Sequence, residues 1–207
     1  CDVHLQPDLL PMLDSGNLMT VADGGVYLLL ELPEQGLPPL ADLVFQLQVR
    51  GITPVVTHPE RHAPLVRRPQ YLAELVERGC LAQVTAGALL GEFGRSARRA
   101  AERFLAGGLA HVVASDAHSA SGPRSPSFAP VRDRLASLVG PERAAQPLAD
   151  AADRNGGREA LRIDFPGLRR VEHMRAERRE LQTLLIARGH DIGEPDGMIG
   201  ARTREAL

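Results

Sequence analysis

Residues 111–118 read H-V-V-A-S-D-A-H, and residues 54–61 read P-V-V-T-H-P-E-R. Each segment is a short β-branched run, typical of a buried strand, that ends abruptly in groups able to bind a metal ion. Parallel α/β proteins build hydrolytic metal sites from side chains at the carboxyl ends of strands. Two such segments in one chain therefore predict a shared metal centre.

The surrounding sequence alternates between strand and helix patterns. Apolar or β-branched runs predict strands at 26–32, 53–57, 81–85 and 111–115. Apolar residues at three- and four-residue spacing predict helices at 38–50, 69–78, 95–105 and 128–139. This alternation predicts an α/β fold with a parallel sheet or barrel, and four strands are too few to close a barrel. We therefore expect the later part of a β/α barrel.

Composition limits the classes of protein that fit. Of the 207 residues, 43% are apolar but only 3% are aromatic, so the core must be aliphatic. The net charge of −2 provides no basic field to attract nucleic acid. No apolar run reaches the roughly 20 residues of a membrane-spanning helix. The sequence predicts neither a nucleic-acid partner nor a membrane span.

The pattern changes beyond the last predicted strand and helix. Residues 151–167 contain N-G-G and P-G steps and are expected to be a linker between residues 1–150 and residues 168–207. The last segment has an amphipathic helix at 172–188, a loop rich in Gly, Pro and Asp, and a new helix near Ala201. It is expected to be a small all-α unit.

Three residues at the strand ends are candidate metal ligands. His58 directly follows the strand at 53–57, and Asp116 and His118 follow the strand at 111–115. In an Asp-x-His sequence both side chains point the same way. A lone histidine there would more often be a capped core residue, but imidazole and carboxylate together suit Mn²⁺, Fe or Zn²⁺.

Two arginines follow these candidate ligands and suit a phosphate substrate. Arg61 and Arg124 each lie a few residues past a strand end, and a guanidinium group binds two phosphate oxygens at once. The alternative for each is an ordinary surface arginine. Neither Cys1 nor Cys80 precedes an arginine at the spacing of a cysteine-dependent phosphatase, so that mechanism is excluded.

Four motifs together resemble one family, the manganese-dependent bacterial protein-tyrosine phosphatases of capsule and exopolysaccharide clusters, which are of the PHP (polymerase and histidinol phosphatase) type. They are 27–33 (YLLLELP), 58–61 (HPER), 83–94 (QVTAGALLGEFG) and 115–118 (SDAH), followed by Arg124. The resemblance covers about residues 1–139. It implies a distorted β/α barrel of the PHP, TIM-like kind with a metal centre at the strand ends.

The resemblance also implies roles for individual residues. His58, Asp116 and His118 would be metal ligands for Mn²⁺, and Arg61 and Arg124 would hold the phosphate. Asp2 occupies the place of the family's bridging glutamate, although it is one methylene shorter. The implied reaction is metal-assisted hydrolysis of phosphotyrosine in a protein such as a bacterial tyrosine kinase, in the cytoplasm, without a covalent phosphoenzyme.

The family's opening His-x-His strand and a further histidine would precede Cys1. We therefore expect a fragment or a fused reading frame, with a centre that binds at most one or two metal ions and has impaired activity.

The tail resembles another family. Residues 180–185 (ELQTLL), 191–197 (DIGEPDG) and Thr203 are similar to the helical peptidoglycan-binding domain of lytic murein transglycosylases. A generic helical hairpin is the alternative. This resemblance implies binding to the cell wall, and the tail alone would indicate a periplasmic location.

Two other readings stay open. The chain could be a non-catalytic peptidoglycan-binding protein, or a fragment of a cell-wall lytic enzyme, that is fused to a relic phosphatase segment. It could also be another PHP phosphoesterase, such as a histidinol phosphatase. Turnover of a phosphate ester with Mn²⁺ distinguishes an enzyme from a wall-binding protein, and the preferred substrate distinguishes the two phosphatases.

Overall fold

The computed structural model describes residues 2–117, 129–140, 146–147, 160–162, 166–195, 202–203 and 206. The strands are β1 (Val3–His4), β2 (Tyr27–Glu31), β3 (Thr53–Thr57), β4 (Leu81–Thr85), β5 (Val112–Ala114), β6 (Gln146–Pro147) and β7 (Ala160–Arg162). The helices are α1 (Leu9–Asp14), α2 (Ala41–Val49), α3 (Ala63–Arg67), α4 (Pro69–Glu77), α5 (Ala86–Leu90), α6 (Gly94–Ala106), α7 (Ala129–Val139) and α9 (Pro166–Ala187). Two 3-10 turns are η1 (Val21–Asp23) and η2 (Pro59–Arg61).

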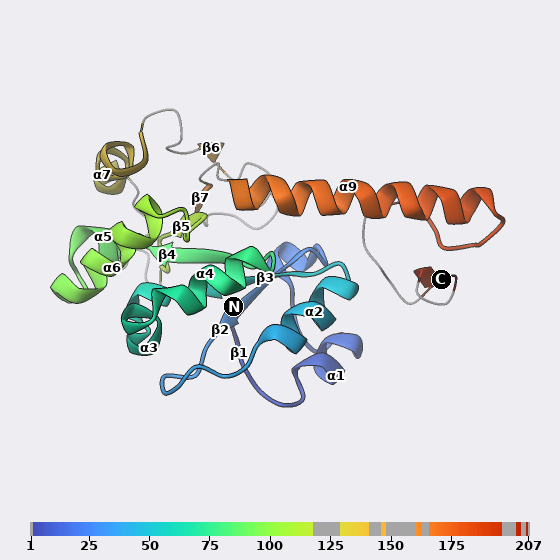
Figure 1. Cartoon of the computed structure of the whole chain (residues 1–207), viewed down its shortest axis with the longest axis horizontal. Coiled ribbons are helices and arrows are strands. Elements are labelled where there is room, and N and C mark those ends of the chain that lie inside the picture. Colours follow the sequence, from blue (N-terminus) through green and yellow to red (C-terminus); the bar gives the residue numbers. More distant parts are fainter. Residues whose placement is uncertain are drawn as a thin grey trace.

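The strands form one sheet in the order β1-β2-β3-β4-β5-β7-β6. The first five strands are parallel, and β7 and β6 are added in antiparallel orientation (Figure 1). The parallel α/β arrangement predicted from the sequence is confirmed, with strands at the four expected places. The strand β1 was not predicted. The assignment of this sheet to part of a β/α barrel stays a prediction.

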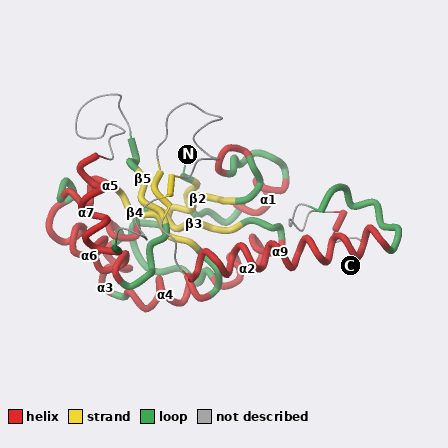
Figure 2. Tube along the Cα trace, turned by 90° about the horizontal axis from the view of Figure 1, so that it is seen from above, coloured by secondary structure: helices red, strands yellow, loops and turns green. Residues whose placement is uncertain are grey.

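The two faces of the sheet are unequally covered. Leu28 and Leu30 are fully buried on one face, in a core shared with α2, α3, α4 and α6. Figure 2 shows α2, α3 and α4 on one side of the strands. Because side chains alternate along a strand, Leu29 points to the other face, where it contacts a small second cluster with Val55 and Leu81. Glu31, two residues after Leu29, shares this second face.

The segment expected to be a linker differs from the prediction. Its residues 160–162 form β7, which pairs with β5, and α9 already begins at Pro166. Further along, Leu185 and Ile192 are buried. Gln182 Nε2 donates to Thr203 Oγ1 at 3.4 Å, so the C-terminal part of α9 contacts the described residues 202–203. The division into two domains and the all-α tail unit stay predictions. No helix in the described parts of the chain has the length and apolar character needed to cross a membrane.

A buried histidine beside β5 makes the stability of the fold depend on pH. The ring of His111 is fully buried, and its Nδ1 accepts a hydrogen bond from the Ala82 N–H at 3.1 Å. Burial lowers the pKa of His111 to about 4. The unfolded chain binds a proton at this residue near pH 6.5, whereas the folded chain does so only near pH 4. Stability is therefore lost as the pH falls from about 6.5 towards 4.

We expect the free energy of unfolding to be about 2 kcal/mol lower at pH 5 than at pH 7.5 because of the lowered pKa of His111. Urea denaturation at both pH values, with the wild-type chain and with His111→Gln, measures this difference. The glutamine does not titrate, so the variant should lose about 2 kcal/mol of the pH dependence, whatever its stability at pH 7.5. An unchanged pH dependence in the variant would contradict the role of His111.

Candidate metal centre

The register of β1 against β2 places two side chains beside the end of β2. Val3 pairs with Leu30 and His4 pairs with Glu31, so the two-residue strand β1 lies against the carboxyl end of β2. Asp2 directly precedes β1, and side chains two residues apart point to the same side of a strand. Asp2 and His4 therefore both lie next to Glu31, although Asp2 is at the start of its own strand.

His58 reaches the same place through an unusual backbone conformation. It follows β3 with φ 34° and ψ 50°, in the left-handed region, and it begins the η2 turn. Asp116, which follows β5, also has a positive φ, of 49°. This conformation costs a non-glycine residue about 1–2 kcal/mol and persists where the surrounding structure imposes it. Two candidate site residues at strand ends share this feature.

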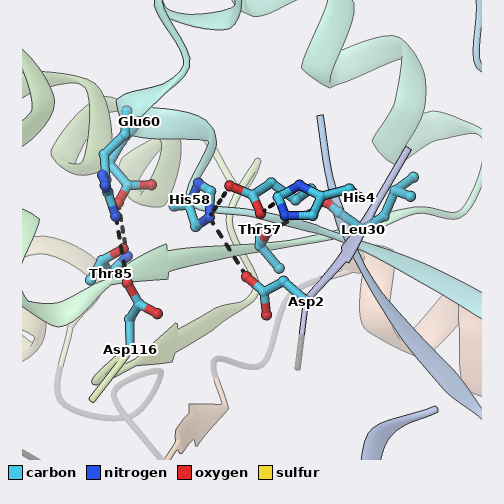
Figure 3. A network of polar contacts seen from close by, with 10 residues as sticks. Asp2, His4, Leu30, Thr57, His58, Glu60, Thr85 and Asp116 are labelled. Carbon is cyan, nitrogen blue, oxygen red and sulfur yellow. Dashed lines mark hydrogen bonds and ion pairs between the residues drawn. The ribbon is translucent and has the colours of Figure 1, made fainter. Parts of the chain in front are cut away.

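Asp2, Glu31 and His58 form a cluster that fits a small divalent cation. His58 Nε2 lies 3.6 Å from Asp2 Oδ2 (Figure 3). It lies 3.3 Å from Glu31 Oε1. The ligand atoms of all three residues lie within 4.8 Å of one another, and each side chain is partly buried. Adjacent ligands of one such cation are separated by about 3 Å. Two carboxylates and one imidazole suit Mn²⁺, Fe or Zn²⁺, and small movements would bring them onto one ion.

The charges in this cluster favour a cation. The polar contact with the His58 ring lowers the pKa of Asp2. Burial alone would lower the pKa of His58, but its contact with Asp2 and the charge of Glu31 outweigh burial and raise it. The raised pKa of His58 means that the two acidic side chains favour its positively charged form. A divalent cation would replace the proton of that form.

His4 supports Glu31 from the solvent side. Its Nδ1 lies 3.1 Å from Glu31 Oε2, whereas Oε1 of the same carboxylate faces His58. A second hydrogen-bond partner of this kind orients a metal-binding carboxylate. The side chain of His4 is 78% exposed, so the contact is screened by water and its effect is small.

Arg61 lies next to the cluster and contacts Asp116. A cavity of about 280 Å³ is lined by Arg61 together with Glu31 and His58. Nη1 of Arg61 lies 3.5 Å from Asp116 Oδ2, and its guanidinium group is stacked 4.4 Å from the centre of the Phe93 ring. The ring contact fixes the plane of the guanidinium group, so its N–H donors lie in a defined direction beside the cavity.

Glu60 fixes the turn that carries His58 and Arg61. It is 1% exposed, and its Oε1 accepts a hydrogen bond from the Thr85 N–H at 2.9 Å (Figure 3). Burial raises the pKa of Glu60. The contact joins η2, which follows β3, to the carboxyl end of β4. It therefore fixes the position of the turn.

The thiol of Cys80 is buried and unreactive, in line with the exclusion of a cysteine-dependent mechanism. Cys80 is 2% exposed, and burial raises the pKa of its thiol to about 12. A thiol in this state does not form the thiolate that attacks phosphorus.

The predicted site residues have different positions. Asp2 and His58 lie together as expected, and Arg61 is adjacent, but Asp116 contacts Arg61 and is not a member of the three-residue cluster. Their roles stay predictions. His118 and Arg124 lie outside the described residues.

Glu31 was missed because it stands in an apolar run that was read only as a buried strand. Its signal was available in the sequence. It is the one acidic residue of Tyr27–Glu31, and it ends β2 just as His58 follows β3.

Comparisons with known proteins identify a family and several similar proteins. A family model described as "Capsular polysaccharide synthesis, CpsB/CapC" matches residues 1–154. The putative tyrosine-protein phosphatase CapC of Staphylococcus aureus is 42% identical over 94 residues, which are 45% of this chain and 37% of CapC. The tyrosine-protein phosphatase YwqE of Bacillus subtilis is 40% identical over 94 residues, which are 45% of this chain and 37% of YwqE.

A solved structure is also similar. It belongs to a study described as crystal structures of YwqE from Bacillus subtilis and CpsB from Streptococcus pneumoniae, "unique metal-dependent tyrosine phosphatases". The TM-score is 0.63 at 31% identity, and the match covers 67% of this chain and 56% of that chain. The chain spans well under half the length of the curated relatives that it matches in sequence.

We expect Glu31→Gln to weaken Mn²⁺ binding at least about tenfold, because it removes a charged oxygen ligand. Isothermal titration of the metal-free chain with MnCl₂ at pH 7.5 measures the affinity. Glu34→Gln is the matched control, since Glu34 lines the same cavity but is not in the three-residue cluster. Equal affinities of the two variants would show that the cation does not bind at Glu31.

Proposed function

The chain belongs to the CpsB/CapC family of capsular polysaccharide synthesis, and on that premise we propose that it hydrolyses phosphotyrosine in proteins. The convergence of Asp2, Glu31 and His58 carries the proposal, because it supplies a cation site beside an arginine. The names of the relatives, which are tyrosine-protein phosphatases, support the substrate class.

The metal ion of this proposal is Mn²⁺, held by Asp2, Glu31 and His58. Asp116 and His118 are proposed as further ligands, on the resemblance described above. When bound, such a cation supplies Lewis acidity towards phosphate oxygens and lowers the pKa of water. The carboxylates would hold the cation in position, and the polar contact with Asp2 holds the ring of His58 in place.

Arg61 binds the phosphate in this mechanism. A guanidinium group forms two parallel hydrogen bonds to phosphate oxygens and offsets the charge that develops on them during transfer. The ring of Phe93 and the carboxylate of Asp116 hold Arg61 at the rim of the cavity that contains Glu31. Arg124 is proposed as its partner from the sequence.

The proposed substrate is a phosphotyrosine protein of a capsule-regulating tyrosine-kinase system, and we place the reaction in the cytoplasm. Binding of peptidoglycan by the tail stays a prediction. Sedimentation of the chain with purified peptidoglycan tests it.

We expect the chain with added Mn²⁺ to hydrolyse p-nitrophenyl phosphate and a phosphotyrosine peptide. Glu31→Gln and His58→Ala should each lower kcat/KM at least about a hundredfold, because the cation lowers the barrier by several kcal/mol. Arg61→Ala should lower it about a hundredfold, and Arg61→Lys should retain more activity because the lysine keeps the charge but loses the two parallel bonds.

Glu34→Gln serves as the control and should retain wild-type rates. Absence of turnover with Mn²⁺, Fe²⁺, Zn²⁺ and Co²⁺ would contradict the proposal. So would a rate that Glu31→Gln leaves unchanged. Faster turnover of histidinol phosphate than of phosphotyrosine peptide would favour another phosphoesterase activity.

A further inference from the structure

A second cavity, of about 440 Å³, also has Arg61 in its lining. It lies among η2, α3 and the start of α6, and it is separate from the cavity that contains Glu31 and His58. Arg61 lines both cavities. A molecule with one group at the metal cluster can therefore place a neighbouring group in the second cavity, which is lined as follows: Glu60, Arg61, Ala63, Val66, Arg67, Phe93, Ser96 and Ala97.

The accessible charge in this cavity is positive. Arg61 and Arg67 are exposed, whereas the only carboxylate of the lining, Glu60, is 1% exposed and accepts a hydrogen bond from the Thr85 N–H. Ser96 and Ala97 belong to the first turn of α6, a 13-residue helix whose N-terminal N–H groups favour an anion. The two guanidinium groups carry positive charge, and the helix N-terminus carries a partial positive charge.

The floor of the cavity is apolar. Phe93, Val66 and Ala97 line it, and Phe93 lies against the guanidinium group of Arg61. Arg103 donates through Nη2 to the Val66 carbonyl oxygen at 2.7 Å, which holds α3 against α6. The cavity thus suits a side chain with an apolar stem and a negatively charged end.

We propose that this cavity binds an anionic side chain that neighbours the phosphotyrosine in the substrate, with Arg67 as the specificity-determining residue. The proposal rests on the phosphatase function proposed above, since it assigns the phosphotyrosine to the cavity of Glu31 and His58. A glutamate, an aspartate or a phosphorylated serine has the required chemistry. A substrate with neutral neighbours offers Arg67 no anion.

Binding of fluorescent peptides to the Mn²⁺-loaded chain tests the proposal. The peptides carry a non-hydrolysable phosphotyrosine analogue flanked by glutamine, by glutamate or by phosphoserine, and fluorescence anisotropy gives each Kd in 150 mM salt. We expect the glutamate peptide to bind about fivefold more tightly than the glutamine peptide, as one partly exposed ion pair of about 1 kcal/mol provides. A tighter phosphoserine peptide would identify phosphate as the preferred anion.

Arg67→Glu should abolish or reverse this preference. Arg68→Glu is the matched control, because Arg68 is also exposed and adjacent in sequence but does not line the cavity, and it should keep the preference. No preference in the wild-type chain would overturn the proposal. An equal loss in both variants would also overturn it, because the effect would then be one of net charge.

Turnover of p-nitrophenyl phosphate, which has no neighbouring residues, separates this proposal from the proposed function. If p-nitrophenyl phosphate is hydrolysed but the glutamate and glutamine peptides bind equally, the second cavity is not the proposed binding site. The proposed phosphatase function is then unaffected. A peptide preference that depends on Arg67, without any turnover, supports the cavity and contradicts hydrolysis.

Discussion

The parallel pairing of β1, β2 and β3 brings the three candidate ligands together. Pairing of His4 with Glu31 places β1 against the carboxyl end of β2, and the left-handed backbone at His58 turns the chain out of β3 towards the same point. Asp2 and Glu31 each contribute an acidic side chain and His58 contributes an imidazole, so the cluster favours a positively charged partner. Each further feature of the site depends on this arrangement.

Residues outside the cluster fix its geometry. Glu60 joins the turn after β3 to the end of β4, and His4 holds the second oxygen of Glu31. On the other side of the turn, stacking on Phe93 restricts Arg61. These contacts hold the cluster and the arginine in fixed positions relative to each other, as a phosphate between a cation and a guanidinium group requires. They also place Arg61 in the lining of both cavities, which extends the site from the phosphate towards the neighbouring residues of a substrate.

The sequence predicted the parallel part of the fold, because a run such as 53–57 is buried on both faces and therefore continuously apolar or β-branched. The family resemblance placed Asp2 and His58 in one metal site, and their shared role as ligands stays a prediction. The sequence did not predict β1, since a two-residue strand has no recognisable pattern, or β7, which lies in a segment rich in Ala, Gly and Arg. Glu31 was missed because one carboxylate in an apolar run carries no information about the strand register that brings it to His58. The contact of Arg61 with Phe93, 32 positions along the chain, is likewise a property of the packing of α6.

The position of a bound metal ion tests whether Asp2, Glu31 and His58 form the cation site. Crystals of the chain grown with Mn²⁺ and measured at the manganese absorption edge would give an anomalous difference peak. If the cluster binds Mn²⁺, the peak lies about 2.0–2.3 Å from oxygen atoms of Asp2 and Glu31 and from a nitrogen atom of His58. A manganese peak elsewhere, or a fully occupied ion that does not contact Glu31, would contradict this cation site.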